Sequence, residues 1–325
     1  MDLGPRTSDR RPSILLVAGE ASGDLHAGRL AAALRARRPE LDIAGMGGEE
    51  MRAAGVRLLV DAKDTAVVGL TELWARRQAL RAALRRLRSH LAEARPSLLI
   101  CVDFPDFNLL LARAAHRLGV PVCYFISPQV WAWRRGRVKT IRRLVRRMLV
   151  LFPFEESLYR DAQVPVRFVG HPLLDVLADA PPRPAARAAL GIPPEARVVG
   201  LLPGSRVAEI GRHLPLLLRA AEHLRAARPD LGVVVGLAQH LDPDPVARMA
   251  GRAGARVVQG RTHALIRASD VLLAVSGTVT LEAAILGTPM VITYRLGWLS
   301  WLLARLLVRV RFIGLPNLVA ERAVV

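Results

Sequence analysis

Short apolar runs alternate with longer helical patterns along nearly the whole chain. In the first half, four such runs are typical of buried strands: residues 14–18, 98–103, 121–126 and 148–151. The helical patterns between them begin near Leu25, Thr71 and Asn108. Strands that are separated by helices usually pair in parallel, with the helices covering the sheet. The alternation therefore predicts an α/β fold built on a parallel sheet.

A proline-rich stretch interrupts this alternation, which then starts again. Prolines gather between residues 181 and 194 and break both the strand and the helix periodicity. Five more apolar runs follow, at residues 198–202, 232–236, 256–258, 271–275 and 290–293. A chain of 325 residues suits two domains of ordinary size. We predict two Rossmann-like domains facing a cleft, over residues 1–177 and 197–325, with a linker over residues 178–196.

Two glycine-containing turns follow predicted strands of the second domain. In Gly204-Ser205-Arg206, glycine allows a phosphate to approach the backbone, and arginine can form paired charge-assisted hydrogen bonds with it. Ser276-Gly277-Thr278 precedes a helix, where free N–H groups and the helix dipole favour an anion. Each turn alone is also typical of an ordinary strand-to-helix connection. Together they predict a nucleotide-diphosphate site.

Two acids are candidates for direct contact with a sugar. Glu282, one turn into the helix after the second glycine turn, can reach a pair of sugar hydroxyls, although an acid there also complements the helix dipole. Asp103, at the end of a predicted strand between phenylalanines, suits a general base, because partial desolvation raises basicity. The alternative for Asp103 is an acid that only hydrogen-bonds within its loop. We also expect Asn108 on the acceptor side of the cleft, although Asp106 or Asn108 at this place is typical of a helix N-cap as well.

The turn after the first predicted strand is also glycine-rich. Its residues Glu20, Ser22, Gly23 and Asp24 lack the spacing of a dinucleotide-binding turn, and its two acids would repel a pyrophosphate. We expect it to contact an acceptor sugar or to take part in closure of the cleft. Asp242-Pro243-Asp244 resembles a metal-binding pair of acids, but its neighbours favour a turn and an N-cap. We predict no metal site.

The chain is strongly basic, with a formal net charge of +19. Such a charge attracts anionic partners, although an arginine-rich composition alone is an alternative explanation. Three segments combine arginines with apolar or tryptophan side chains that suit a membrane interface: Val67, Val68 and Leu70 before a Leu- and Arg-rich helix; Trp131 and Trp133 before Arg134 and Arg135; and Trp298 with Trp301. Packing on the sheet is the alternative for the leucines. No nucleic-acid-binding module is present.

Hydropathy and cysteine content indicate where in the cell the protein is expected to work. No apolar run is long enough to span a bilayer, so we expect any membrane contact to be peripheral. Only Cys101 and Cys123 occur, each in an apolar run, which excludes a disulfide framework and fits a reducing cytoplasm.

Seven motifs together resemble those of the lipid-A-disaccharide synthase family, over residues 14 to 325. They are Leu16-Val17-Ala18-Gly19-Glu20-Ala21-Ser22-Gly23-Asp24, Asp103-Phe104-Pro105-Asp106-Phe107-Asn108, Ser127-Pro128-Gln129-Val130-Trp131-Ala132-Trp133-Arg134, Phe152-Pro153-Phe154-Glu155, Gly170-His171-Pro172-Leu173, Leu202-Pro203-Gly204-Ser205-Arg206 and Leu315-Pro316-Asn317-Leu318. The long tryptophan-containing motif is the most specific of them.

The resemblance implies a GT-B fold and an inverting, metal-independent and cofactor-free transfer. The sugar moved is 2,3-diacylglucosamine, from UDP to 2,3-diacylglucosamine 1-phosphate (lipid X), in lipopolysaccharide biosynthesis. Asp103 matches the base that deprotonates the acceptor 6-hydroxyl, and Arg206, Glu282 and Asn317 match positions that contact UDP. We also expect His171 on the acceptor side.

The resemblance also implies partners and a location. The first domain would bind the acceptor and an anionic membrane, and the second the UDP-sugar. The enzyme would be peripheral on the cytoplasmic face of the inner membrane of a Gram-negative bacterium, and a homodimer is a further expectation. Family members continue past the position of Val325, so a C-terminal segment is expected to be missing.

Two other functions fit the same architecture. A UDP-sugar 2-epimerase would need no acceptor lipid, and a non-catalytic membrane-bound sugar-nucleotide binder would form no product.

Overall fold

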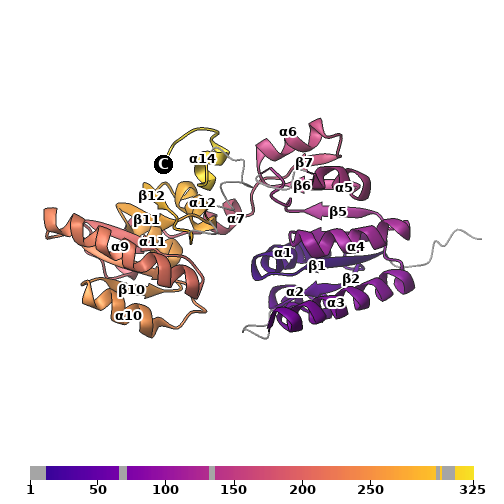
Figure 1. The fold of residues 1–325 in the computed structure, drawn as a ribbon, viewed down its shortest axis with the longest axis horizontal. Coiled ribbons are helices and arrows are strands. Elements are labelled where there is room, and N and C mark those ends of the chain that lie inside the picture. Colours follow the sequence, from indigo (N-terminus) through magenta and orange to yellow (C-terminus); the bar gives the residue numbers. More distant parts are fainter. Residues whose placement is uncertain (1–11, 66–71, 132–135, 298–300, 302–311) are drawn as a thin grey trace, which may run out of the picture. The chain divides into compact units, whose positions relative to one another are not determined.

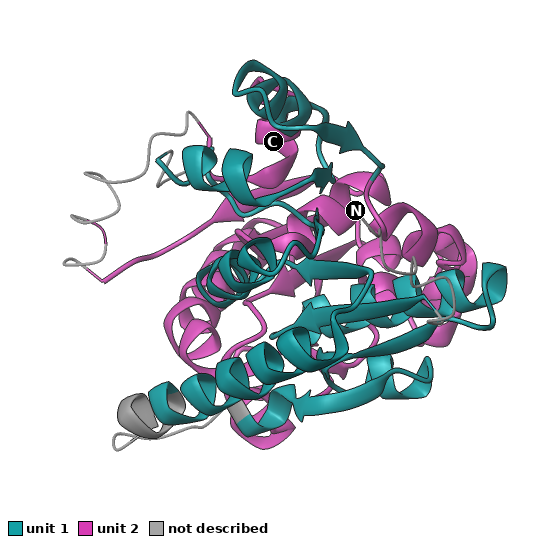
Figure 2. Ribbon diagram, turned by 90° about the vertical axis from the view of Figure 1, so that its right-hand side faces the viewer, with its two compact units in different colours: residues 1–170 teal, residues 171–325 magenta. Residues whose placement is uncertain are grey.

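The computed structural model describes residues 12–65, 72–131, 136–297, 301 and 312–325 (Figure 1). The chain divides into two compact units, residues 1–170 and residues 171–325 (Figure 2). The division falls between Gly170 and His171, earlier than the predicted boundary after residue 177. The stretch predicted as a linker contains helix α8 (Arg183–Ala189), which packs on α11 (Thr262–Ala268) of unit 2. Prolines are tolerated in the first turn of α8, because N–H groups there have no intrahelical partner.

Unit 1 is a seven-stranded parallel sheet with the strand order β3-β2-β1-β4-β5-β6-β7. Its strands are β1 (Ser13–Ala18), β2 (Asp42–Gly47), β3 (Arg57–Asp61), β4 (Leu98–Val102), β5 (Val122–Phe125), β6 (Arg147–Val150) and β7 (Val166–Phe168). The order reverses between β1 and β4, so the loops that leave these two strands diverge at the point where open α/β sheets bind ligands. The predicted parallel α/β sheet is confirmed.

Helices cover both faces of this sheet. They are α1 (Ala21–Arg37), α2 (Glu49–Ala53), α3 (Glu72–Ala94), α4 (Pro105–Arg117), α5 (Arg137–Leu144) and α6 (Pro153–Asp161), with a 3-10 turn η1 (Ala62–Thr65). Alternate residues of β1 enter different cores: Leu15 and Val17 pack with α3 and α4, whereas Leu16 packs with α1. Burial on both faces explains why the strands are continuous apolar runs.

Unit 2 is a five-stranded parallel sheet with the order β10-β9-β8-β11-β12. Its strands are β8 (Val198–Leu202), β9 (Gly232–Leu237), β10 (Arg256–Gln259), β11 (Val271–Val275) and β12 (Met290–Thr293). Its other helices are α7 (Leu173–Ala178), α9 (Val207–Ala227), α10 (Pro243–Arg252), α12 (Thr278–Ile285) and α14 (Leu315–Val319). Asp242 caps α10 by accepting the Asp244 N–H, as predicted for this Asp-Pro-Asp segment.

Candidate active site

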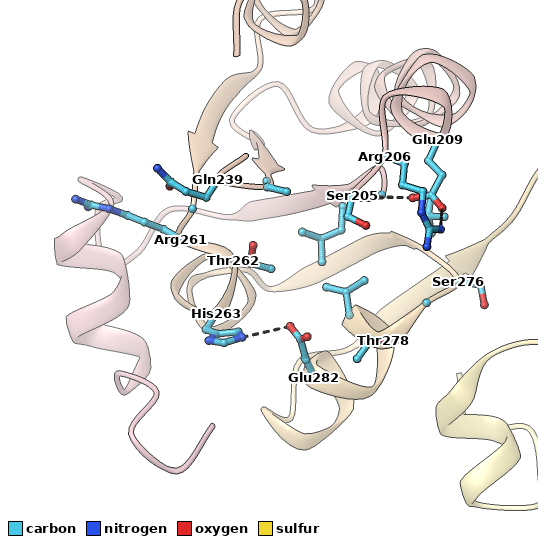
Figure 3. Close-up of a pocket in the computed structure, with 18 of the residues that line it drawn as sticks. Ser205, Arg206, Glu209, Gln239, Arg261, Thr262, His263, Ser276, Thr278 and Glu282 are labelled. Atoms are coloured by element: carbon cyan, nitrogen blue, oxygen red, sulfur yellow. Dashed lines mark hydrogen bonds and ion pairs between the residues drawn. The ribbon is translucent and has the colours of Figure 1, made fainter. Parts of the chain in front are cut away.

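A pocket in unit 2 lies at the carboxyl ends of neighbouring parallel strands and has a volume of about 810 Å³. Leu202 at the end of β8 and Val275 at the end of β11 contribute to its apolar surface. Its polar and charged side chains come from the loops and helices that follow the strands: Ser205, Arg206, Glu209, Gln239, Arg261, Thr262, His263, Ser276, Thr278 and Glu282 (Figure 3). A pocket of this size holds a small-molecule ligand.

The turn from β8 to α9 holds an arginine and a glutamate in contact. The Glu209 carboxylate accepts the Ser205 backbone N–H at 3.0 Å and the Arg206 guanidinium at 2.8 Å. Gly204 has a φ of +113°, and a Cβ there would lie 2.6 Å from the Glu209 carboxylate, so only glycine fits the turn. Burial raises the pKa of Glu209, but the hydrogen bonds outweigh it, and the net shift is downward. Arg206 itself remains 77% exposed.

The turn from β11 to α12 directs a helix N-terminus at the pocket. Gly277 precedes the helix, and no side chain in the described part of the chain caps its first turn. Ser276 donates its hydroxyl to the carbonyl of Ile313 at 3.2 Å, and Thr280 donates to the carbonyl of Gly277. The uncapped end of α12 therefore carries the partial positive charge that attracts anions.

Across the pocket, His263 at the start of α11 forms an ion pair with Glu282 of α12. Its Nε2 lies 3.3 Å from Glu282 Oε2 (Figure 3). The hydrogen bond to Glu282 raises the pKa of His263, and this effect outweighs burial, which lowers it. The pair joins two helices that leave different strands.

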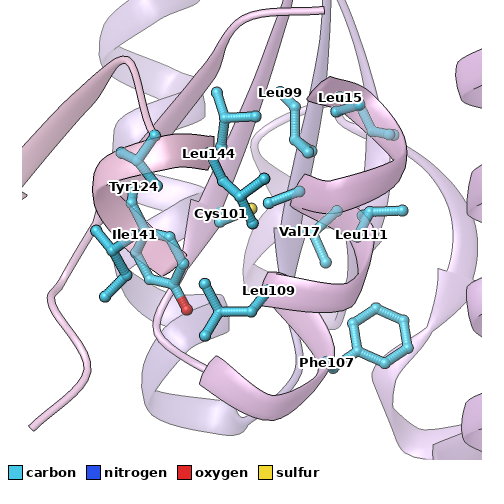
Figure 4. Close-up of a cluster of buried hydrophobic side chains, with 14 of the residues drawn as sticks. Leu15, Val17, Leu99, Cys101, Phe107, Leu109, Leu111, Tyr124, Ile141 and Leu144 are labelled. Carbon is cyan, nitrogen blue, oxygen red and sulfur yellow. The ribbon is translucent and has the colours of Figure 1, made fainter. Parts of the chain in front are cut away.

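In unit 1, the turn from β4 to α4 holds Asp103 in an uncommon conformation. Asp103 and Phe104 both have a positive φ, +45° and +49°, which side chains rarely adopt. The Asp103 carbonyl accepts two hydrogen bonds of 2.7 Å, from Asn108 Nδ2 and from the Tyr124 hydroxyl. Tyr124 belongs to the buried cluster of Figure 4, so the turn rests on the core of the unit.

The Asp103 side chain lies in a partly buried and acidic environment. Burial, and then the negative charge of Glu20, raise its pKa to about 6, while the Phe104 N–H lowers it. Gly19 allows the Phe104 ring to pack here, because a Cβ at position 19 would lie 2.2 Å from that ring. A carboxyl group with such a pKa can take up a proton near neutral pH.

The sequence profile of the lipid-A-disaccharide synthetase family matches residues 14–325. The chain belongs to the lipid-A-disaccharide synthase family. The synthase of Myxococcus xanthus (strain DK1622) is 46% identical over 316 residues, which are 97% of this chain and 82% of that protein. The synthase of Geobacter sulfurreducens is 48% identical over 98% of this chain and 84% of its own length. The synthases are glycosyltransferases, so this chain is an enzyme of that class, and the epimerase alternative is not favoured.

Solved structures share the fold at much lower identity. The UDP-GlcNAc 2-epimerase from Neisseria meningitidis bound to UDP-GlcNAc has a TM-score of 0.62 at 13% identity, covering 95% of this chain and 90% of that one. A ugt transferase from Siraitia grosvenorii in complex with UDP has a TM-score of 0.55 at 16% identity, covering 88% and 82%. At such identities the likeness concerns the fold alone. It confirms the predicted GT-B fold.

In this member of the synthase family, most of the residues predicted to bind UDP lie together around the pocket of unit 2. Seven of the eight line the pocket: Gly204, Ser205, Arg206, Ser276, Gly277, Thr278 and Glu282. Asn317 is not among the lining residues. Its side chain instead accepts the N–H groups of Val324 and Val325 and donates to the Val325 carbonyl. That these residues bind UDP stays a prediction.

Two residues predicted on the acceptor side are buried and have structural partners. Asp24 is 6% exposed, and its carboxylate accepts the backbone N–H groups of Gly48, Glu50 and Met51, which anchors the start of α2. Asn108 is fully buried and donates to backbone carbonyls at the end of β4. These contacts give both side chains a structural role, and a contact of either one with the acceptor stays a prediction.

The other acceptor-side candidates differ in exposure. Glu20 and Ser22 are exposed, and the charge of Glu20 acts on Asp103, whereas Gly23 is buried in α1. His171, the first residue of unit 2, accepts the Leu173 N–H through Nδ1 at 3.1 Å.

The residues expected at a membrane fall largely outside the described residues: Val67, Val68, Leu70, Trp133, Arg134, Arg135 and Trp298. Trp301 is 51% exposed.

Trp131 is half-buried, donates its indole N–H to Glu155 at 3.3 Å and meets Phe154 edge-on. Trp131 is therefore held by α6 in this structure. None of the described helices is long and apolar enough to cross a membrane.

Sequence reasoning missed three charged or titratable residues among those that line the pocket: Glu209, Arg261 and His263. Glu209 has a detectable signal, since an acid in the first turn of a helix often accepts N–H groups at that end. His263 has none, because its partner Glu282 lies on a different helix and only the packing of α11 beside α12 joins them.

Proposed function

We propose that this chain transfers 2,3-diacylglucosamine from its UDP derivative to the 6-hydroxyl of 2,3-diacylglucosamine 1-phosphate. Family membership supports the reaction, since the relatives are named lipid-A-disaccharide synthases. The observation that carries the donor assignment is the pocket of unit 2, where two turns suited to phosphate and the carboxylate of Glu282 converge.

The diphosphate of the donor would lie against the N-terminus of α12 and Arg206. The guanidinium is paired with Glu209, but its 77% exposure leaves it free to turn toward an anion. Both groups would stabilise the charge that develops on UDP as it leaves. Glu282, deeper in the pocket, would accept hydroxyl groups of the nucleotide ribose.

Asp103 would act as the general base. The 6-hydroxyl oxygen of the acceptor attacks the anomeric carbon, the bond from that carbon to the diphosphate oxygen breaks, and UDP leaves with the bonding electrons. The Asp103 carboxylate takes the hydroxyl proton. A single displacement inverts the anomeric configuration, and the proton transfer contributes roughly 10²–10⁴-fold to the rate.

Both substrates carry acyl chains, so the protein would work on a membrane surface. Four arginines around the end of α5 and the start of β6 are exposed and would contact anionic headgroups: Arg142, Arg143, Arg146 and Arg147. The double variant Arg142→Glu/Arg143→Glu should lose binding to vesicles that contain phosphatidylglycerol. The matched double variant Arg248→Glu/Arg252→Glu, on α10, makes the same charge change and should retain binding. Equal binding by both variants would contradict this surface.

The reaction is tested by incubating the protein with both acylated sugars and analysing the products by mass spectrometry. We expect disaccharide 1-phosphate and UDP in equal amounts, and no change of the donor when the acceptor is left out. Epimerised donor without acceptor would indicate the 2-epimerase activity instead. UDP binding without any product would indicate a sugar-nucleotide binder.

A further inference from the structure

The ion pair between His263 and Glu282 lies in the pocket, and no sequence motif predicted it. The two side chains come from α11 and α12 and meet at 3.3 Å on the wall of the pocket (Figure 3). Their side chains are 38% and 16% exposed, so the carboxylate is the more enclosed partner. We propose that His263 is a positioning residue that holds the Glu282 carboxylate for the two ribose hydroxyls of the bound nucleotide. The inference rests on the proposed UDP donor.

The two oxygens of the Glu282 carboxylate have different partners in this arrangement. His263 Nε2 donates to Oε2 of Glu282, which leaves Oε1 and the remaining lone pairs for the ligand. A ribose presents two neighbouring O–H donors, and an ionised carboxylate offers acceptors only. A glutamate without such a partner populates several rotamers. Nucleotide binding would then have to fix one of them, and the lost side-chain entropy would weaken the affinity.

The charges of the residues that line the pocket also support a positioning role for His263. Among the described residues that line it, the acids are Glu209 and Glu282, and each one has a basic side chain beside it. Arg206 contacts Glu209 and His263 contacts Glu282. A nucleoside diphosphate is itself an anion, so an unpaired carboxylate in this pocket would repel it. His263 therefore lets an acid required for hydroxyl recognition coexist with a diphosphate.

A direct contact between His263 and the diphosphate is the competing explanation. The two explanations predict different ligand dependence. If His263 acts through Glu282, its loss affects only ligands that have ribose hydroxyls. If it contacts the phosphates, its loss weakens every uridine diphosphate equally.

The test measures the dissociation constants of UDP and of 2′,3′-dideoxyuridine diphosphate by calorimetry. For the wild-type protein we expect a preference for UDP of about 10-fold, as for one charge-assisted hydrogen bond. His263→Phe and Glu282→Gln should each abolish most of this preference, and the double variant should lose no more than either. His263→Gln keeps an N–H donor and should restore much of the preference. In transfer assays, the KM of the donor should rise in His263→Phe with little change in kcat.

The exposed His223 on α9 gives the matched control, since His223→Phe makes the same change away from the pocket. Retention of the full preference in His263→Phe, or an equal loss for both nucleotides, would overturn the inference while leaving the proposed function intact. Absence of UDP binding by the wild-type protein would overturn both. If His263→Phe does not fold, the Glu282→Gln and His263→Gln variants decide: a Glu282→Gln protein that keeps the preference also overturns the inference.

Discussion

Asn108 donates its side-chain N–H to the backbone carbonyl of Asp103 at 2.7 Å, across a turn in which Asp103 and Phe104 are both left-handed. Left-handed residues other than glycine cost roughly 1–3 kcal/mol each. The second hydrogen bond to the same carbonyl, from Tyr124, and the burial of both donors offset that cost. The proposed base is thus presented by a turn that the core holds in place.

Loosening this turn should impair transfer more than donor binding. Asn108→Ala removes one of the two donors to the Asp103 carbonyl, so the free energy of unfolding should fall by about 1–3 kcal/mol. The kcat should fall by about 10-fold or more, because a displaced base is a poor base, while the affinity for UDP in unit 2 stays the same. Tyr124→Phe removes the other donor alone and serves as a comparison. A destabilised variant with unchanged kcat would show that the contact does not position Asp103.

The activity should depend on the protonation of Asp103. Because burial and the charge of Glu20 raise its pKa to about 6, the base is lost as the pH falls through that value. We expect kcat/KM to rise with pH up to about 6 and then to level off. Glu20→Gln removes the nearby charge and should move this limb to lower pH, whereas Glu40→Gln, at an exposed position before β2, should not. A limb that stays in place in Glu20→Gln would contradict the coupling.

Glu155 should make the stability of unit 1 depend on pH. Its carboxyl is 3% exposed beneath Trp131, and burial raises its pKa to about 7, although hydrogen bonds from Phe152, Trp131 and Leu151 oppose the shift. The folded protein then binds more protons than the unfolded chain between about pH 4.5 and pH 7. The free energy of unfolding should fall as the pH rises through that window, by up to about 3 kcal/mol.

Denaturation across this window in wild type, Glu155→Gln and the neighbouring control Glu156→Gln checks this prediction. Only Glu155→Gln should flatten the dependence. An unchanged slope in that variant would assign it to other groups.

Asp24 should prove to be a structural residue. Asp24→Ala leaves three backbone N–H groups at the start of α2 without their acceptor, so the free energy of unfolding should fall by about 2–4 kcal/mol. Asp24→Asn keeps one acceptor oxygen and should lose less. Chemical denaturation measures both. An Asp24→Ala protein that is as stable as the wild type but inactive would contradict the structural role and support the sequence-based expectation of an acceptor contact.

The strands of this fold are predictable where both faces of the sheet are buried, because apolar residues then run without interruption, as in β1 and β8. Strand β2 was not predicted, since Gly45 and Gly47 interrupt its apolar run. A Cβ at Gly45 would lie 1.7 Å from the Leu16 carbonyl, so close contact with β1 requires the residue that lacks strand propensity.

The candidate site also has parts that the sequence predicts and parts that it does not. The glycine turns of the pocket are local, and their residues could be found from spacing after a strand. The start of α4 could not: we expected a helix from Asn108, but it begins at Pro105, because two left-handed residues end the strand at Val102. The pairing of His263 with Glu282 and the burial of Asp24 also depend on contacts between distant segments.

The most direct test of the account measures transfer and UDP binding together in Asp103→Asn. This substitution keeps the shape of the side chain but removes the group that accepts the proton. We predict that the rate of disaccharide formation falls by about 10²–10⁴-fold, while the dissociation constant of UDP, which depends on unit 2, stays at the wild-type value. Turnover close to that of the wild type would contradict Asp103 as the base.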